Sequence, residues 1–360
     1  MECGWKPNWE ETKKHFVDWW EHRGLVLGAW APPLGGRREA MPDPGNPSSV
    51  EAFYTDTSWR ARSNHHRLAG SEFPADVLPL AGVDIGPGSL ALAMGSEPVL
   101  RFDTVWYKPF MENEPEPEKL PPLRFDPESR WWRAHESALT ECARLGRGKY
   151  AVGCPDLIEN ADTLASLRGT LRMLEDMAER PSWVEEKLAE INRAWFEAYD
   201  RVYEIIKLGD GSSCYSAFAL WGPGKVAKVQ CDSSAMFSPA MFKRFAVPAL
   251  SEQCGWLDYS MFHLDGAHCL PHLDLLLGIK ELDAIEWTTN PKVPSGGNPE
   301  WYGLYRRILK AGKSVQAVGL NPDEVVPLLD ACGGKGMYLM VNTGSAAEIE
   351  KLLKAVAQFR

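Results

Sequence analysis

Short apolar runs alternate with amphipathic segments throughout the second half of the chain. Residues 225–232 have the apolar, β-branched character of a strand, and residues 238–256 have the period of a helix with a Ser-Pro start. Residues 258–265 predict the next strand, and the alternation continues to a last helix over residues 345–359. Because parallel strands need such helical crossovers, five successive units indicate a doubly wound parallel sheet or a closed barrel.

The first half of the chain decides between these two folds. Residues 25–31, 75–84 and 149–156 supply three further candidate strands, which brings the expected number to eight. No Gly-x-Gly-x-x-Gly turn follows the first strand, so a dinucleotide-binding sheet loses its best sequence sign. We therefore predict an α/β protein, a (β/α)8 TIM barrel that forms a single domain over residues 1–360. Its strands are expected to end near Trp30, Asp84, Cys154, Asp232, Asp265, Thr288, Gly319 and Thr343.

Two segments interrupt this repeat. Residues 32–75 contain a run rich in proline and glycine, and residues 96–125 predict a small β excursion followed by an acidic, proline-rich loop. Both follow predicted strands at their carboxyl ends, where barrel enzymes carry their active-site loops, so we expect both insertions over the barrel mouth. Trp106 and Tyr107 are expected to cover the mouth and contact substrate. Surface decoration is the alternative interpretation of the acidic loop.

Composition and charge narrow the possible partners. The chain has 360 residues, 44% of them hydrophobic, and a formal charge of -10 from 49 acidic and 39 basic residues. A sizeable core is therefore possible, and nucleic acid or an anionic membrane is disfavoured as a partner. The chain starts without a continuous apolar stretch and has no run of about eighteen apolar residues, so we expect a cytoplasmic protein. The eight cysteines form no Cys-x-x-Cys pair, which argues against a zinc knuckle.

Polar residues gather at the predicted carboxyl ends of neighbouring strands. Because side chains alternate along a strand, Lys228, Gln230 and Asp232 share one face of the fourth strand. A barrel interior is normally lined by valine, isoleucine and leucine, so this polar face predicts a cavity with acid, base and hydrogen-bonding groups. The strand-end residues expected to converge there are Asp232, His263, Asp265, Glu286, Thr288 and Asn342.

The sequence FHLDGAHCLPHLD holds three histidines in two different environments. His263 and Asp265 are expected at a strand end, where they either bind a metal or form a pair in which Asp265 orients His263 for proton transfer. His268 and His272 belong to the following loop and helix start. Their i,i+4 spacing is compatible with a metal site, but a proline lies between them, so capping or packing is the favoured interpretation.

Several of these segments resemble one known family. The run SPAMFKRFAVPAL, the strand ending in the His-x-x-Gly tetrapeptide HLDG, and LPHLDLLLGIKELDAIEW are similar to the uroporphyrinogen decarboxylase-like barrels. DLIENADTLASLRGTLRMLEDMAERPSWVEEKL resembles that family's segment after the third strand. The likeness covers residues 150–358 well and the first 150 residues loosely. It implies a barrel with its site at the strand carboxyl ends, and the family also contains methyltransferases linked to corrinoids or folate.

The resemblance also implies a zinc site, from which this chain departs in its ligands. The family's zinc methyltransferases bind metal through a His-x-Cys on the fifth strand and a later cysteine near the eighth, and the zinc activates a thiol acceptor. His263 matches the histidine, Asp265 stands where the first cysteine would be, and Asn342 stands near the later one. A His/Asp site with Asp232 or Glu286 as third ligand can still hold zinc, without thiolate softness.

The decarboxylase itself is a poorer match. It carries an Arg-Gln-Ala-Gly-Arg run at its first strand, which holds substrate carboxylates, and an aspartate after the second strand. In this chain the first strand ends in Trp30 and Ala31, Arg37 and Arg38 are displaced, and Asp84 takes the place of that aspartate. We therefore do not expect uroporphyrinogen decarboxylation.

Three functions remain open. The first, from the resemblance, is a methyltransferase or demethylase that acts on a small methylated substrate, with zinc as a candidate metal and a corrinoid (cobalamin) protein or folate as methyl carrier. The second, from the residues alone, is a glycoside-cleaving barrel with paired carboxylates, in which some of the fifteen tryptophans bind sugar unless they simply pack. The third is a non-catalytic barrel that binds a small molecule.

The sequence leaves the substrate and the oligomeric state open, together with lyase or hydrolase chemistry. For an enzyme, the candidate catalytic residues are His263, Asp232, Glu286 and Asp84, the candidate substrate contacts are Trp30, Trp106, Tyr107, Gln230 and Asn342, and the candidate metal ligands are His263 and Asp265.

Overall fold

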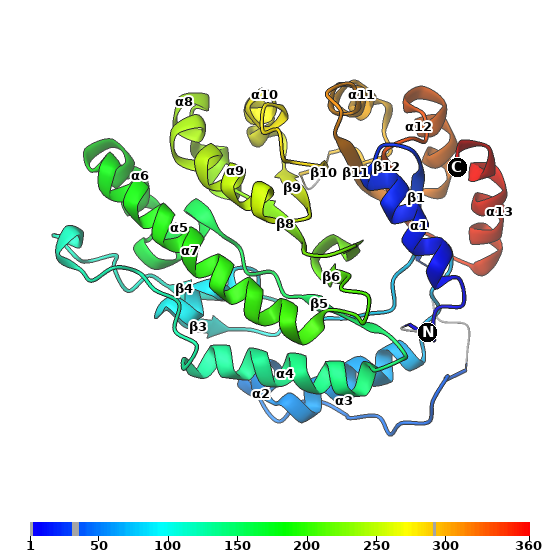
Figure 1. Ribbon diagram of the computed structural model, residues 1–360, viewed down its shortest axis with the longest axis horizontal. Helices are drawn as coiled ribbons and strands as arrows, with labels where there is room; N and C mark the ends of the chain where they lie inside the picture. The colour runs from blue at the N-terminus through cyan, green and yellow to red at the C-terminus, as the bar shows by residue number, and fades with distance from the viewer. Residues whose placement is uncertain (1–2, 31–35, 291–292) are drawn as a thin grey trace.

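A parallel sheet of six strands forms the centre of the protein. The computed structural model describes residues 3–30, 36–290 and 293–360. The strand order of this sheet is β1–β12–β11–β10–β9–β8, and every neighbouring pair is parallel. Figure 1 shows the helices arranged in an arc outside the strands. The six strands are β1 (Leu25–Trp30), β8 (Val226–Gln230), β9 (Tyr259–Asp265), β10 (Ala284–Thr288), β11 (Ser314–Leu320) and β12 (Met337–Asn342).

A second sheet has the order β2–β5–β6–β7, with β7 antiparallel to β6 and the other neighbours parallel. Hydrogen bonds connect β1 to the segment that precedes β2, and β8 to β6. The N–H of Asp76 donates to the carbonyl of Leu27 in β1 at 2.9 Å, and the N–H of Val226 in β8 donates to Ser213 Oγ in β6 at 3.4 Å. The strands of this sheet are β2 (Leu80–Ala81), β5 (Ala151–Cys154), β6 (Ser213–Tyr215) and β7 (Leu220–Gly222).

The parallel α/β architecture predicted from the sequence is confirmed, and the eight predicted strands end at or near their expected positions. Their backbone hydrogen bonds group them into two sheets rather than one continuous ring. Two features account for this. β2 has only two strand residues, and a hairpin formed by β6 and β7, which the sequence analysis did not predict, stands between β5 and β8.

The helices that connect and flank these strands follow the predicted crossovers. Between β8 and β9, the short helix α8 (Pro239–Met241) continues through a π-helical turn (Phe242–Ala246) into α9. The longer helices are α1 (Trp9–Trp20), α3 (Thr57–Ala69), α4 (Arg130–Gly146), α5 (Asn160–Arg168), α6 (Thr170–Glu179), α7 (Pro181–Ile206), α9 (Val247–Trp256), α11 (Tyr302–Lys310), α12 (Val325–Cys332) and α13 (Ala346–Val356), with α2 (Val50–Thr55) and α10 (Leu273–Leu277) shorter.

Helix α1 packs aromatic side chains against the central sheet. Phe16 and Trp19 are fully buried, and their ring centroids lie 5.4 and 5.5 Å from that of Tyr338 in β12. Trp19 Nε1 also donates to the carbonyl of Val315 in β11 at 3.2 Å. Most of the helical tryptophans therefore pack in the core, which agrees with the packing interpretation rather than with a sugar-binding role. The buried tryptophans include Trp9, Trp19, Trp20, Trp131, Trp132, Trp183, Trp195, Trp221, Trp287 and Trp301.

The first predicted insertion, residues 32–75, contains two helices. Residues 31–35, which include its start and the predicted strand residue Ala31, lie outside the described part of the chain. The remainder contains α2 and α3, and α3 packs against α4. The second half of this segment therefore provides the helical crossover between β1 and β2, while residues 36–49 are a loop as expected.

The second predicted insertion, residues 96–125, begins with an antiparallel hairpin of β3 (Glu97–Leu100) and β4 (Val105–Lys108). The acidic loop that follows is fastened to helices α5 and α6. Arg168 Nη1 donates to the carbonyl of Glu114 at 2.9 Å, and Arg180 pairs with Glu118 at 2.7 Å.

Among the described helices, none has both the length and the apolar character that crossing a membrane requires.

Candidate functional site

A row of polar side chains crosses five neighbouring strands of the central sheet in register. Gln230 of β8 pairs with His263 of β9, which pairs with Glu286 of β10. Glu286 in turn pairs with Gln316 of β11, and Gln316 pairs with Tyr338 of β12. Residues in register on parallel strands point to the same side of the sheet, so these five side chains form one polar band. The alternation read from the sequence for β8, β9 and β10 is therefore confirmed.

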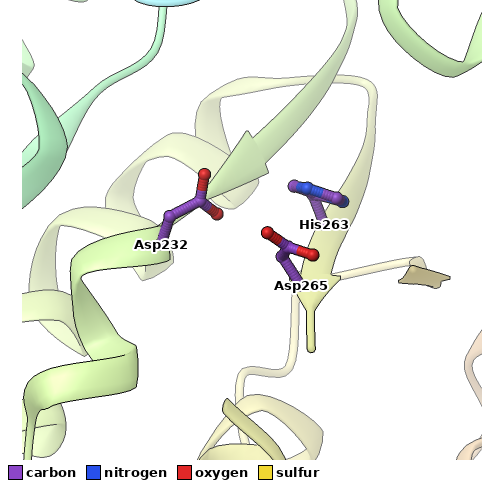
Figure 2. A group of neighbouring side chains, drawn as sticks. All are labelled: Asp232, His263 and Asp265. Atoms are coloured by element: carbon purple, nitrogen blue, oxygen red, sulfur yellow. The ribbon is translucent and has the colours of Figure 1, made fainter. Parts of the chain in front are cut away.

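Asp232, His263 and Asp265 converge at the carboxyl-end side of this band (Figure 2). His263 and Asp265 lie two residues apart on β9, and Asp232 opens the 3-10 segment that follows β8. One ligand atom from each of the three side chains lies within 4.8 Å of the other two, which makes this a group that could hold a metal ion. Asp232 thus joins the two ligands expected from the sequence.

Glu286 holds the imidazole of His263 from the neighbouring strand. Glu286 Oε2 accepts a hydrogen bond from His263 Nδ1, and Glu286 Oε1 accepts one from Thr288 Oγ1 at 2.6 Å. Burial by itself would lower the pKa of His263, but the hydrogen bond and the charge of Glu286 outweigh it and raise that pKa. Since Nδ1 is engaged, Nε2 is the ring nitrogen left to bind a ligand. Metal-binding histidines are commonly oriented by a carboxylate in this way.

The backbone and carboxylate of Asp232 are held by two neighbours. Asp162 of α5 accepts from the N–H of Asp232 at 2.7 Å and from the N–H of Ser233 at 2.8 Å. Gln230 Nε2 donates to Asp232 Oδ2 at 2.8 Å. Solvent reaches Asp232, but the surrounding protein and the charge of Asp162 raise its pKa to about 7. Asp232 therefore changes its protonation state close to neutral pH.

A chain of hydrogen bonds connects Asp84 to Asp232. Asp84 Oδ1 accepts from the N–H of Asp156 at 2.7 Å, and Asp156 pairs with the buried Lys228 at 2.8 Å. Lys228 also donates to Gln230 Oε1, and Gln230 donates to Asp232. Burial disfavours the ammonium of Lys228, but the charges of Asp156 and of another carboxylate raise its pKa. Asp84 is thus tied to the cluster through three intervening side chains rather than by direct contact.

Three carboxylates near the site were not among the sequence candidates. Asp156, Glu159 and Asp162 follow β5 directly, in the sequence CPDLIENAD. Glu159 is fully buried, its Oε1 accepts from the N–H of Gln230, and burial raises its pKa. The signal that could have revealed them is the same one that revealed Asp232, namely carboxylates immediately after the carboxyl end of a parallel strand.

Trp30 and Asn342 lie side by side at the ends of β1 and β12. The ring of Trp30 folds back over β1, so closely that a methyl group on Gly28 would lie 2.5 Å from its Cη2 atom. The carbonyl of Trp30 accepts from Thr343 Oγ1 at 2.7 Å. Within the described residues, no hydrogen bond joins Trp30 or Asn342 to the Asp232, His263 and Asp265 group. Their role as substrate contacts stays a prediction.

Trp106 and Tyr107 point to opposite faces of β4, as adjacent strand residues must. The Tyr107 hydroxyl donates to the carbonyl of Ile85 at 3.0 Å and also contacts the Pro87 carbonyl, in the loop that follows β2. The side chain of Trp106 is 64% exposed. Tyr107 therefore fastens the hairpin to the loop of Asp84, and Trp106 alone has the exposure that a substrate or partner contact requires.

His272 packs in the core instead of binding a ligand. It is 1% exposed, its ring stacks on Phe242 with centroids 4.4 Å apart, and its Nε2 contacts the carbonyl of Ser234 at 2.8 Å. Ser234 belongs to the segment that begins at Asp232. The packing interpretation of His272 agrees with this geometry, whereas the neighbouring His268 is exposed.

Replacing His272 by alanine should lower the free energy of unfolding by about 2–4 kcal/mol, because a buried ring and its hydrogen bond are lost together. Chemical denaturation measures this change. The exposed His268 provides the matched control, and His268→Ala should stay within about 0.5 kcal/mol of the parent protein. Equal effects of the two substitutions would contradict the core assignment of His272.

The three converging side chains suit a divalent metal of hard or borderline character. Two carboxylates and one imidazole are known zinc ligands, and three protein ligands leave a coordination position for another molecule. Cys269, the nearest thiol in the sequence, is buried and accepts a hydrogen bond from Ser234 Oγ at 3.4 Å; it does not belong to the ligand group. The donor set fits zinc without sulfur.

Comparison with known proteins adds one finding. No protein-family model matches the chain, and no curated protein matches it in sequence. Among solved structures, a methyltransferase from Methanosarcina mazei superposes with a TM-score of 0.64 over 97% of this chain and 98% of that one, at 12% sequence identity. At this identity the likeness concerns the fold alone, which the chain shares with that protein over nearly its whole length.

Proposed function

We propose that the protein is a metal-dependent methyltransferase or demethylase of the uroporphyrinogen decarboxylase-like barrel type, acting on a small methylated substrate. The observation that carries the proposal is the group of Asp232, His263 and Asp265, with His263 oriented by the buried Glu286. The fold likeness to a methyltransferase supports the same reaction class. The proposal of a barrel is supported by the eight predicted strands and by the hydrogen bonds that link the two sheets near β1 and β8.

Zinc is the proposed metal, and Asp232, His263 and Asp265 would hold it. When bound, zinc acts as a Lewis acid that lowers the pKa of a thiol or other acceptor in its open coordination position. Aspartate in place of cysteine leaves more positive charge on the ion, which favours this activation. The neighbouring side chains prepare the ligands: Glu286 fixes the tautomer of His263, and Gln230 fixes Asp232 Oδ2.

The methyl carrier is proposed to be a corrinoid bound to a partner protein, with folate as the other candidate. Large exposed apolar side chains support a macromolecular partner on the face that carries the site. Four of them lie in or beside the β3–β4 hairpin, one follows β8, one follows β10, and one lies at the start of α6. Among the described residues they are Val99, Phe102, Trp106, Phe110, Leu171, Met236 and Val293.

A methyl-transfer assay tests this function. The purified protein, loaded with Zn²⁺, is incubated with cob(I)alamin and a panel of methylated thiols, amines and methoxy compounds, and methylcobalamin is followed by its absorbance. Tetrahydrofolate replaces cobalamin in a parallel series. We expect zinc-dependent methylation of one of the two carriers by at least one substrate class. Failure of every combination with fully loaded protein would contradict the proposal.

One observation favours a second candidate, a glycoside-cleaving enzyme. An oxygen of Asp232 lies within 4.8 Å of one of Asp265, close to the roughly 5 Å that separates the carboxyl groups of retaining glycosidases. The raised pKa of Asp232 would suit the acid of such a pair. Hydrolysis of nitrophenyl glycosides by metal-free protein, abolished by Asp232→Asn, would establish this function in place of the first.

A further inference from the structure

The turn that joins β6 to β7 has a strained backbone. It comprises residues 216–219, and Phe218 and Ala219 both have positive φ angles, of 60° and 49°. Residues other than glycine rarely adopt this conformation because the Cβ atom approaches the carbonyl oxygen, at a cost of about 1–2 kcal/mol each. Two such residues in succession persist only where the surrounding structure fixes them.

The inner side of this turn lies against the polar band of the central sheet. The ring of Phe218 packs against the imidazole of His263, with centroids 4.7 Å apart and an interplanar angle of 38°. The carbonyl of Phe218 accepts from Gln316 Nε2 at 2.8 Å, and the carbonyl of Ala219 accepts from the Tyr338 hydroxyl at 3.2 Å. Three members of the band, from β9, β11 and β12, therefore contact two adjacent turn residues.

The start of the turn is fixed to the second sheet. The N–H of Ser216 donates to the carbonyl of Cys154 in β5 at 2.9 Å, and Ser216 Oγ donates to Asp84 Oδ1 at 3.1 Å. The approach to β5 is so close that a methyl group on Gly153 would lie 2.7 Å from the Ser216 nitrogen. The turn thus spans from one sheet to the other, and its contacts on both sides hold the strained residues in place.

His263 is consequently held on two sides. Glu286 binds Nδ1 in the direction of the ring edge, and Phe218 covers a ring face, so together they restrict both the rotation and the tilt of the imidazole. The charged groups whose fields act on His263 are Glu286, Lys228 and Asp232. Phe218 adds no charge to this set, so its effect on His263 is one of position. A side chain that only fills space in the core would not require a turn with two positive φ angles whose carbonyls are both fixed by hydrogen bonds.

We propose that Phe218 is a positioning residue, which holds the imidazole of His263 in the orientation that directs Nε2 to the metal between Asp232 and Asp265. The turn from Ser216 to Ala219 is the device that places its ring there. This inference rests on the function proposed above for the metal, but the orientation of His263 can be measured in the metal-free protein and does not depend on catalysis.

The test compares Phe218→Leu with Phe242→Leu, since Phe242 also packs its ring against a histidine, His272, which does not belong to the group of Asp232, His263 and Asp265. Ring signals of His263 are followed by NMR in metal-free protein, and Zn²⁺ affinity is measured by calorimetry. Because Phe218→Leu removes the ring current of Phe218 in any case, the readout is the orientation of the imidazole, taken from the nuclear Overhauser contacts of the His263 ring protons. Phe218→Leu should change these contacts and weaken Zn²⁺ binding about tenfold or more. Phe218→Tyr should restore both, and Phe242→Leu should leave the His263 contacts unchanged.

Tyr338→Phe provides a second variant, because it removes the hydroxyl that holds the Ala219 carbonyl while it keeps the ring and its packing. It should change the Overhauser contacts of the His263 ring in the same direction as Phe218→Leu by a smaller amount, and weaken Zn²⁺ binding about two- to fivefold. Unchanged Overhauser contacts of the His263 ring in both Phe218→Leu and Tyr338→Phe would overturn the positioning role. Absence of Zn²⁺ binding in the parent protein, with the expected changes in these contacts present, would instead overturn the proposed metal function alone.

Discussion

Replacing His263 by alanine should weaken Zn²⁺ binding by at least about 100-fold and abolish methyl transfer. The substitution removes one of three ligand side chains, and loss of an outer partner alone typically costs about 10–100-fold in metal affinity. It also leaves the buried carboxylate of Glu286 without the imidazole, at a cost of about 1–3 kcal/mol in the free energy of unfolding. The melting temperature should therefore fall by only a few degrees. Calorimetric titration and thermal denaturation measure the two effects.

His268→Ala is the matched control for this experiment. His268 lies in the same stretch of sequence, on the same histidine-rich segment, but it is exposed and belongs to no group of converging ligands in the described chain. Its replacement should leave both Zn²⁺ affinity and activity within about twofold of the parent. Full activity and unchanged Zn²⁺ affinity in His263→Ala would show that the Asp232, His263 and Asp265 group is not the chemical centre.

Zn²⁺ affinity should increase as the pH rises through 7. In Asp232→Asn, the number of protons released on Zn²⁺ binding should be about one lower than in the parent protein. The carboxyl of Asp232 has a pKa of about 7 in the folded protein and must lose its proton to bind metal. Below pH 7, deprotonation of Asp232 should therefore raise the Zn²⁺ affinity of the parent protein about tenfold for each pH unit. Deprotonation of His263 should contribute further. Titrations in buffers of different ionisation enthalpy count the released protons directly.

The exposed carboxylate of Asp274, which pairs with Arg307, serves as control because Asp274→Asn should release the same number of protons as the parent.

The stability of Asp232→Asn gives an independent check. A raised pKa means that the folded state binds the proton more tightly than the unfolded chain, so the contribution of Asp232 to stability falls as pH rises from about 4 to about 7. Asp232→Asn should match the parent at pH 4 and exceed it by about 1 kcal/mol at pH 8, a modest gain because solvent reaches the carboxylate. An identical proton count in Asp232→Asn and the parent would contradict the assignment of Asp232 as a ligand.

Local sequence pattern was sufficient for eight of the strands and for the shared face on which several candidate site residues lie. The period-two alternation in β8 and β9 placed Gln230, His263 and Asp265 on one face, and the register of the sheet brings these residues together. Alternation along a strand depends only on backbone geometry, so it can be read without knowledge of the partners. His272 could be separated from His263 by another local signal, the proline before His272, which marks a helix start.

The remaining carboxylates near the site and the β6–β7 hairpin depend on contacts between distant parts of the chain. Asp156 and Asp162 bind residues in and just after β8, about seventy positions away, and nothing in their local sequence indicates these partners. The β6–β7 hairpin was missed because its strands have three residues each and its turn lacks the glycine or asparagine that positive φ angles usually require. Tertiary contacts with Gln316 and Tyr338 hold that turn, and they override its local preference.

X-ray absorption at the zinc edge tests the central proposal most directly, because it reports the ligands of the bound metal. A site formed by Asp232, His263 and Asp265 predicts a first shell of nitrogen and oxygen only, at about 2.0–2.2 Å, with the outer scattering of one imidazole. That imidazole signal should disappear in His263→Ala. A sulfur shell at about 2.3 Å, or a first shell with no histidine in the parent protein, would place the metal elsewhere and contradict the proposal.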